Sequence, residues 1–244
     1  MGGVRVNKNS ATYWFPKVKN LDVLVPQTEI IGIDSNRNVM NWLDNGVPRD
    51  VIHRVKSCVR RHFNLNYPIF MRTDLLSAKH DYEKTCLVQS EDEIGGHLYQ
   101  LIMSHLTTML KNGNELKAIL VREKLDIKSK FTAFWDGLPI GVEVRHFISN
   151  GEWGKGHFYW PKKAIKNPSA ENWEELLDQM LIEAGEGFKR HKNMAEIVAK
   201  KFEGNWSVDF AKTKSGKWYL IDMAVAEDSW VAEEESLYFE NPTK

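Results

Sequence analysis

The 244-residue sequence predicts an α+β fold, with helices segregated from mainly antiparallel strands, and three observations support this prediction. Apolar residues recur at helical spacing in separate blocks at 48–64, 90–113 and 173–202. Runs rich in β-branched and aromatic residues flank three turn dipeptides: Asp136-Gly137, Asn150-Gly151 and Ser215-Gly216. Strands joined by such short turns run antiparallel, so the second half of the chain should form antiparallel sheets.

Composition and charge are those of an ordinary globular protein. Apolar residues make up 42% and charged residues 27% of the chain, and the formal net charge is zero. Zero net charge provides no broad attraction for nucleic acid or an anionic membrane, and no apolar run approaches the ~18 residues of a membrane span. Two cysteines, Cys58 and Cys86, are too few for a disulfide framework or a zinc cluster. We therefore expect a soluble, cytoplasmic protein without membrane or nucleic-acid partners.

Residues 1–66 form an N-terminal segment whose role the sequence leaves open. Between 11 and 34, aromatic residues, two prolines and a Val-Leu-Val run allow a strand and an edge that meets a second substrate or a partner. Residues 48–64 predict an amphipathic helix with a basic outer face. That face is either a solvated surface or a binding surface for an acidic partner or RNA, and the zero net charge favours the solvated surface.

Residues 67–122 are expected to form a first lobe. The stretches "YPIFMRTD" (67–74) and "KTCLVQ" (84–89) predict two strands, which flank a loop at 75–83. Ser90 and Glu93 match a capping box that opens a helix ending near a glycine at 113. The stretch "ELKAILVREKLDI" that follows predicts a buried strand running into a charged connector.

Residues 123–244 are expected to form a second lobe of hairpins and two helices. In "GVEVRHF" (141–147), Val144 shares one strand face with His146, while Glu143 and Arg145 share the opposite face. One face is therefore apolar and the other charged. The charged face either lines a cleft together with other carboxylates, or it carries a structural ion pair of Glu143 with Arg145 or with Lys130.

The last hairpin sets two acidic residues against each other. If Ser215-Gly216 is a two-residue turn, Asp209 lies directly opposite Asp222. Like charges in that position destabilise a sheet by ~0.2–1 kcal/mol unless a cation lies between them or one carboxyl is protonated. The alternative is a solvated face with a register shifted by one residue. Because a hard ion such as Mg²⁺ is held by one or two carboxylates plus substrate phosphates, the pair predicts a metal site.

The succession of these motifs resembles the ATP-grasp superfamily. The motifs are a lysine loop in "MRTDLLSAKH", a strand ending in "ILVREKLD", the "E-V-R" hairpin and the final "V-D-F … L-I-D" hairpin. Within the ATP-grasp superfamily, the chain is most similar to the compact branch with the cell division cycle protein 123 family and related phage and bacterial proteins. This resemblance covers roughly residues 68–230. The resemblance implies two α+β lobes with mainly antiparallel sheets that clamp ATP and Mg²⁺.

The resemblance also implies roles in the first lobe and connector. Lys79 would contact the ATP phosphates, with Arg72 beside it, and Lys79 would act in catalysis by neutralising phosphoryl charge. Residues 121–124 would meet the adenine edge through backbone groups. They include three charged residues of the expected nucleotide site: Arg122, Glu123 and Lys124. Asp126 or Glu123 would bind the ribose hydroxyls.

In the second lobe, the resemblance implies that Asp209 and Asp222 hold Mg²⁺ and that Glu143 belongs to the nucleotide site. Arg145 would be the second catalytic residue, steadying the transferred phosphoryl oxygens. The superfamily usually has Asn two residues after the last acidic ligand, where this chain has Ala224. A second metal ion would therefore require a carboxylate from 227 or 228.

Three functions remain open from the sequence. The first is a ligase that uses Mg-ATP to activate a carboxylate as an acyl phosphate and couples it to an amine or a similar nucleophile. The second is an ATP-binding assembly factor with little turnover, and the third is a protein-binding domain without a nucleotide. The acceptor, a small molecule or a protein, is not specified by the sequence.

Overall fold

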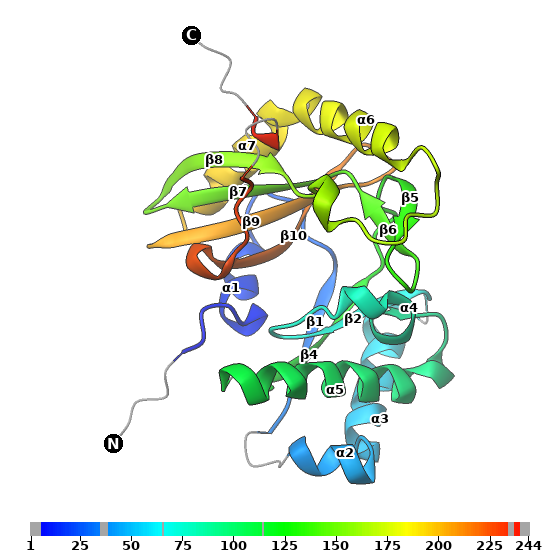
Figure 1. The fold of residues 1–244 in the computed structure, drawn as a ribbon. Coiled ribbons are helices and arrows are strands. Elements are labelled where there is room, and N and C mark those ends of the chain that lie inside the picture. Colours follow the sequence, from blue (N-terminus) through cyan, green and yellow to red (C-terminus); the bar gives the residue numbers. More distant parts are fainter. Residues whose placement is uncertain (1–5, 35–38, 65, 114, 234–236, 240–244) are drawn as a thin grey trace. The chain divides into compact units, whose positions relative to one another are not determined.

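The computed structural model describes residues 6–34, 39–64, 66–113, 115–233 and 237–239. Two compact units are present (Figure 1): Pro26–Lys124, here called the first lobe, and Met1–Val25 with Leu125–Lys244, here called the second lobe. Within the described ranges, no helix combines the length and the apolar character that crossing a membrane requires.

The first lobe is a four-stranded antiparallel sheet in the order β1-β4-β2-β3 with helices on one face. Its strands are β1 (Thr28–Gly32), β2 (Ile69–Thr73), β3 (Leu87–Val88) and β4 (Ala118–Glu123). Its helices are α2 (Trp42–Asn45), α3 (Arg49–His62), α4 (Tyr82–Thr85) and α5 (Ile94–Asn112).

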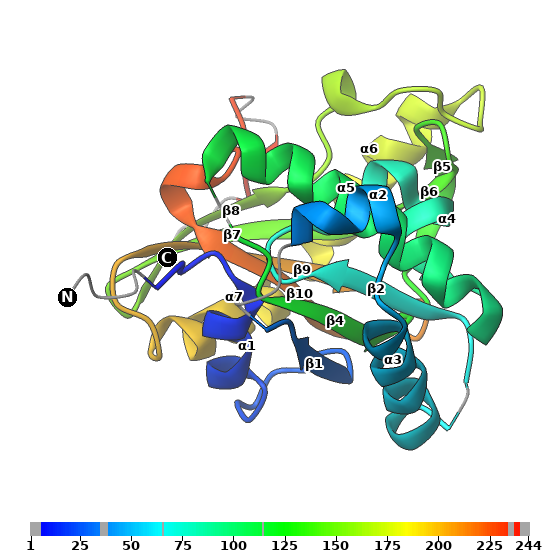
Figure 2. The ribbon, with the colours of Figure 1, turned by 90° about the horizontal axis from the view of Figure 1, so that it is seen from below.

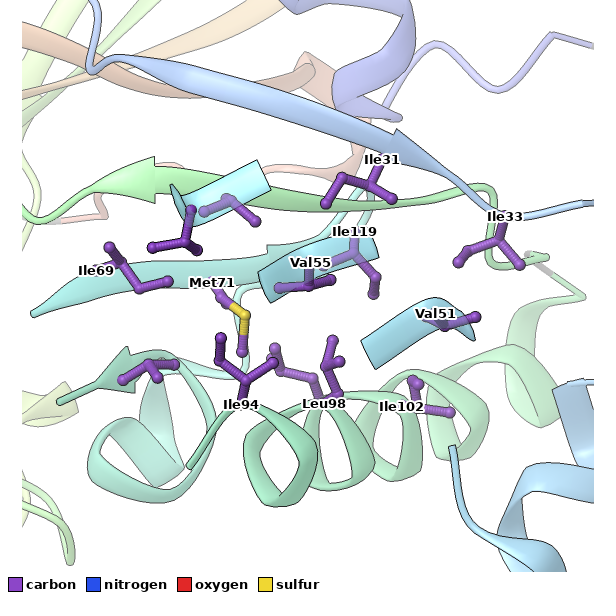
Figure 3. Close-up of a cluster of buried hydrophobic side chains, with 14 of the residues drawn as sticks. Ile31, Ile33, Val51, Val55, Ile69, Met71, Ile94, Leu98, Ile102 and Ile119 are labelled. Carbon is purple, nitrogen blue, oxygen red and sulfur yellow. The ribbon is translucent and has the colours of Figure 1, made fainter. Parts of the chain in front are cut away.

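The core of this lobe lies between the sheet and the apolar faces of α3 and α5 (Figure 3). Val51 and Val55 of α3 are fully buried, as the helical spacing of 48–64 predicted. Leu98 and Ile102 of α5 face the sheet, which contributes apolar residues from three strands: Ile31, Ile69, Met71 and Ile119.

Two local predictions for the first lobe were wrong. The expected loop at 75–83 contains a 3₁₀ turn, Lys79–Asp81, and the first half of α4, because the Thr85 hydroxyl donates to the Asp81 carbonyl (2.6 Å) and keeps this turn helical. The capping box predicted at Ser90 and Glu93 is not formed. The chain enters α5 through a 3₁₀ turn, so the Glu93 carboxylate accepts from the N–H of Gln89 (2.8 Å) and the Ser90 side chain does not cap the helix. The predicted stop is confirmed, with Gly113 at φ 69°.

The second lobe contains a four-stranded antiparallel sheet in the order β10-β9-β7-β8 and a separate β5-β6 hairpin. Its strands are β5 (Ser129–Ala133), β6 (Leu138–Gly141), β7 (Glu143–Ser149), β8 (Glu152–Phe158), β9 (Asn205–Lys212) and β10 (Trp218–Val225). Its helices are α1 (Ala11–Val18), α6 (Trp173–Glu186) and α7 (Phe188–Ala199). The hairpin turns predicted at Asp136-Gly137 and Asn150-Gly151 are confirmed, with Gly137 at φ 62° and Gly151 at φ 90°.

The face of the larger sheet that packs against α7 holds a buried chain of hydrogen bonds. The Trp153 indole N–H donates to His146 Nδ1 (2.8 Å), His146 Nε2 bonds to His191 Nδ1 (2.7 Å), and His191 Nε2 bonds to the Ala184 carbonyl (3.0 Å). Because an indole only donates and a carbonyl only accepts, the chain has one direction, and both imidazoles are neutral with the proton on Nε2. Burial lowers the pKa of His191 to about 4, and that of His146 also falls well below its ordinary value.

The boundaries between the lobes lie after Val25 and after Lys124, whereas the sequence analysis expected them after residues 66 and 122. Residues from 26 onward belong to the first lobe because β1 pairs with β4 along its whole length. The first 25 residues belong to the second lobe. There the Asn9 side chain accepts from the Val225 N–H (2.6 Å), and the Leu24 carbonyl accepts from the Leu220 N–H (2.8 Å).

Candidate functional site

A row of ionisable side chains crosses the second-lobe sheet. His157 of β8 pairs in register with Arg145 of β7, Arg145 with Asp209 of β9, and Asp209 with Asp222 of β10. Because side chains alternate along strands, these four residues lie on the face opposite the one that bears His146 and packs on α7. We call this the polar face.

The opposition of Asp209 and Asp222 is confirmed, although the predicted turn is wrong. The loop has three residues, Lys214–Gly216, with Gly216 at φ 80° and the Thr213 N–H bonded to the Lys217 carbonyl (2.8 Å). This turn alone would shift the register by one residue. A bulge between Leu220 and Asp222 shifts it back, so the two departures cancel.

Arg145 and Asp209 form a bidentate ion pair at the centre of the row. Nε and Nη2 of Arg145 each donate to one Asp209 oxygen at 2.7 Å, and Nη1 donates to the Trp230 carbonyl (3.1 Å). The guanidinium carbon lies 4.8 Å from the ring centre of Tyr159. Arg145 and Asp209 are 9% and 5% exposed, so the pair is held in a low-dielectric environment.

Burial and charge oppose each other at this pair. Burial acts to lower the pKa of Arg145, but the adjacent Asp209 carboxylate, with a smaller contribution from Asp222, raises it above its ordinary value. At His157, burial lowers the pKa to about 4, and the positive charge of Arg145 acts in the same direction. Arg145 is therefore permanently charged, and His157 is neutral at physiological pH.

The chain after β10 returns along the polar face, which the sequence did not predict. The 3₁₀ turn Ala226–Asp228 follows β10, and the Ser229 hydroxyl lies 2.7 Å from that of Ser207 on β9. The Trp230 ring packs edge-on against His157, with 5.0 Å between ring centres. The sequence analysis also gave no role to His157. Because side chains alternate along a strand, His157 shares the face of Lys155, two residues earlier in "GKGHF", and this alternation would have placed it on the polar face.

Glu143 also lies on the polar face. It precedes Arg145 by two residues on β7 and lies opposite Ala211 of β9. It is 5% exposed, and a Cβ added at Gly141 would lie 3.3 Å from its Oε1, so the small residue makes room for the carboxylate. The Lys130 amine, one of the two structural partners considered from the sequence, bonds to Gln179. The other, Arg145, is paired with Asp209.

The predicted phosphate-contacting residues of the first lobe both act electrostatically on Cys86. Burial raises the pKa of the Cys86 thiol to about 11, while the positive charges of Arg72 and Lys79 both act to lower it. Arg72 lies on β2 and donates through Nε to the Thr73 carbonyl (3.2 Å). Lys79 follows Ala78, which adopts a left-handed backbone conformation (φ 51°). Both cations lie in the first lobe.

The predicted adenine-contacting residues lie at the end of β4. Glu123 and Lys124 line a pocket of about 400 Å³ in the first lobe, and the Glu123 carboxylate accepts from the Gln27 N–H (2.8 Å). Arg122 lies on β4 opposite Phe70 of β2. Asp126, the other candidate for the ribose, belongs to the second lobe, where it forms an exposed ion pair with Lys214 (2.9 Å).

The structure thus groups Glu143, Arg145, Asp209 and Asp222 on one face of the second-lobe sheet, whereas Arg72 and Lys79 belong to the first lobe. In the described part of the chain, no group of three or more His, Cys, Asp or Glu side chains is arranged to hold a metal ion. The two facing carboxylates are a smaller donor set, of the oxygen type that Mg²⁺ accepts together with phosphate oxygens.

No family model matches the sequence, and no curated protein matches it by sequence. The structure is similar to that of Cdc123 from Schizosaccharomyces pombe, with a TM-score of 0.57, 11% identity and coverage of 91% of this chain and 87% of that one. A C-terminally truncated form of the same protein gives a TM-score of 0.57 and 12% identity, with the same coverage of both chains. N5-carboxyaminoimidazole synthase from Aspergillus clavatus gives a TM-score of 0.46 and 9% identity, and the alignment covers 88% of this chain and 44% of that one.

This chain therefore shares the fold of Cdc123, and the resemblance to the compact branch with the cell division cycle protein 123 family, drawn from the sequence, is confirmed at the level of the fold. The α+β class with antiparallel sheets in two lobes is confirmed as well.

Proposed function

We propose that the protein binds Mg-ATP and uses it to activate a carboxylate. A carboxylate oxygen of the acceptor attacks the γ-phosphorus, ADP leaves, and an amine or similar nucleophile then attacks the acyl phosphate and displaces phosphate. The single observation that carries this proposal is the row His157–Arg145–Asp209–Asp222 on an ATP-grasp-like fold.

The charges of the row support a cation site. Arg145 compensates one carboxylate, so the three charged groups together carry one negative charge beside neutral His157. Each Asp209 oxygen uses one lone pair for Arg145 and keeps another, and Asp222 lies opposite. Asp209 and Asp222 would hold Mg²⁺, which would neutralise phosphate charge when bound.

The remaining residues would bind the nucleotide. Arg72 and Lys79 would contact the phosphates, because two cations near each other match the charge of a polyphosphate. The pocket at Glu123 and Lys124 would take the base and ribose, with Glu123 or Asp126 on the ribose hydroxyls. Arg122 and Glu143 would also bind the nucleotide.

Magnesium-dependent ATP binding tests this function. Calorimetric titration of the full chain with ATP should give tighter binding in Mg²⁺ than in excess chelator. Asp222→Asn should remove most of that difference, because it halves the carboxylate set. Asp178→Asn is the matched control, since Asp178 is an exposed carboxylate of α6 paired with Lys162 (3.0 Å). Equal affinity with and without Mg²⁺ in the parent protein would exclude the metal assignment.

A second candidate is an ATP-binding assembly factor with little turnover. The observation that favours it is the engagement of Arg145, whose Nε, Nη1 and Nη2 all donate within the protein and whose fork is occupied by Asp209. An ADP-release screen with amino acids, peptides and RNA separates the two. Turnover with any of them supports the ligase, whereas tight Mg-ATP binding without turnover supports the assembly factor.

A further inference from the structure

The outer edge of the first-lobe sheet is available for strand pairing. β1 is the outermost strand, and among the described strands it pairs with β4 alone. The Gln27 carbonyl accepts from the Glu123 N–H (2.9 Å), and the Ile33 N–H donates to the Lys117 carbonyl (2.7 Å), so the odd-numbered residues bond inward. The N–H and C=O groups of Thr28 and Ile30 therefore point away from the sheet.

A groove of about 320 Å³ runs between this edge and helix α3, which lies beside β1 (Figure 2). Three consecutive β1 residues, Glu29 to Ile31, form one wall. The helix wall comprises six residues: His53, Arg54, Ser57, Cys58, Arg61 and His62. A chain extended along β1 would direct alternate side chains toward this wall.

The helix wall of the groove is basic. Arg54 and Arg61 are permanently charged, and Glu29 is the one acidic residue among the described lining residues. Glu29 lies 3.3 Å from Nδ1 of His62, and Arg54 Nη2 donates to the Gly32 carbonyl (2.8 Å) at the end of β1. Positive charge is thus positioned along the open strand edge.

The opposite flank of α3 also carries two cations and one carboxylate. There Arg60 is compensated by Glu91, to which its Nε donates at 2.9 Å, and Lys56 lies 3.9 Å from the same carboxylate. Each flank thus keeps one positive charge beyond its carboxylate, and on the groove side this charge lies along the open strand edge.

We propose that an acidic segment of another protein docks along β1 as an added strand. Backbone hydrogen bonds to Thr28 and Ile30 would supply affinity, and alternate Asp or Glu side chains would meet Arg54 and Arg61. An extended peptide satisfies both features at once, because RNA has no backbone that matches the N–H and C=O spacing of a strand edge. Apart from His62, which also lines the pocket proposed for the base and ribose, the groove residues lie outside the proposed nucleotide site.

The test begins with selection of peptides from a random ten-residue display library on the full chain without nucleotide. Selected peptides should carry acidic residues at every second position. A fluorescein-labelled selected peptide should lose at least ten-fold in affinity when N-methylated at residues that pair with β1, and less than two-fold when N-methylated at the residues between them. A flat N-methyl profile, or peptides without acidic residues, would overturn the proposal.

Charge variants complete the test. Arg61→Glu should weaken the selected peptide roughly five-fold or more, because an attraction is replaced by a repulsion. Arg49→Glu, an exposed change of the same charge on the same helix outside the groove, is the matched control and should change affinity less than two-fold. If a single-stranded RNA 12-mer binds more tightly than the selected peptide and its binding depends on Arg61, the occupant of the groove is RNA and the proposal is wrong. If the chain self-associates and Arg61→Glu abolishes this, the occupant is a second copy of the chain and the proposal is equally wrong.

Discussion

Mild acid should destabilise the second lobe through its buried histidines. His157 and His191 are both fully buried, and burial lowers the pKa of each to about 4, against ~6.5 in an unfolded chain. The folded pKa lies below the unfolded value, so the unfolded chain binds protons first as the pH falls. The stability is therefore complete above about pH 6.5 and is lost progressively down to about pH 4.

The size of this effect follows from the shifts. Between about pH 6.5 and pH 5 the unfolded histidines take up protons while the folded ones do not, which costs ~1.36 kcal/mol per pH unit for each group. His157 and His191 together should therefore remove about 4 kcal/mol at pH 5. His146, whose pKa burial also lowers, acts in the same direction. That loss is a large part of the 5–15 kcal/mol typical of a folded domain.

The assay is urea unfolding of the parent, His157→Gln and His53→Gln at about pH 7.5 and pH 5. The quantity compared is the change in unfolding free energy between the two pH values, so an equal loss of stability at both pH values cancels. His157→Gln should reduce this change by about 2 kcal/mol. His53 is exposed on α3, and His53→Gln should leave it unaltered. The same pH dependence in His157→Gln and in the parent would refute the reasoning.

Three further outcomes are expected. Lys79→Ala should weaken ATP binding about ten-fold in calorimetry and leave the free energy of unfolding unchanged, because Lys79 contributes charge rather than apolar packing. A loss of unfolding free energy typical of a core truncation, roughly 2–5 kcal/mol, would show that Lys79 has a structural role. Arg145→Lys should reduce any turnover on the order of 10²-fold while ATP affinity changes a few-fold, since lysine keeps the charge beside Asp209 but cannot hold both carboxylate oxygens in place; parallel loss of affinity and turnover would contradict this. Gly156→Ala should cost about 1–3 kcal/mol in urea unfolding, because its Cβ would overlap the His146 ring, whereas Gly185→Ala on α6 meets nothing within 4 Å and should be neutral or stabilising.

The sequence predicted those features that depend on nearby residues. The turns at Asp136-Gly137 and Asn150-Gly151 follow from local backbone preferences, and helix 48–64 follows from its apolar spacing. The opposition of Asp209 and Asp222 was predicted correctly, although the predicted turn was wrong. A bulge that no local sequence signal marks offsets the extra loop residue. Local patterns thus fix elements more reliably than they fix register.

Features that depend on distant residues were missed. Pairing of β1 with β4 joins residues about 90 positions apart, for instance Ile30 with Leu120, and apolar alternation cannot specify such a partner. Contacts of Trp230 with Arg145 and His157 were missed because the chain after β10 has no regular pattern to predict its course. The roles of the site residues remain predictions, since they concern bound molecules.

The pairing of Arg145 with Asp209 changes which residue reports on the metal. Removing the Asp209 carboxylate would leave a buried guanidinium uncompensated, at a cost of roughly 3–5 kcal/mol, so lost ATP binding in such a variant would follow from misfolding as readily as from a lost ligand. Asp222 is only half-buried and sits at the far end of the row from His157. Its carboxylate is the negative charge that Arg145 does not compensate directly, and it is therefore the residue at which a metal function can be separated from a structural one.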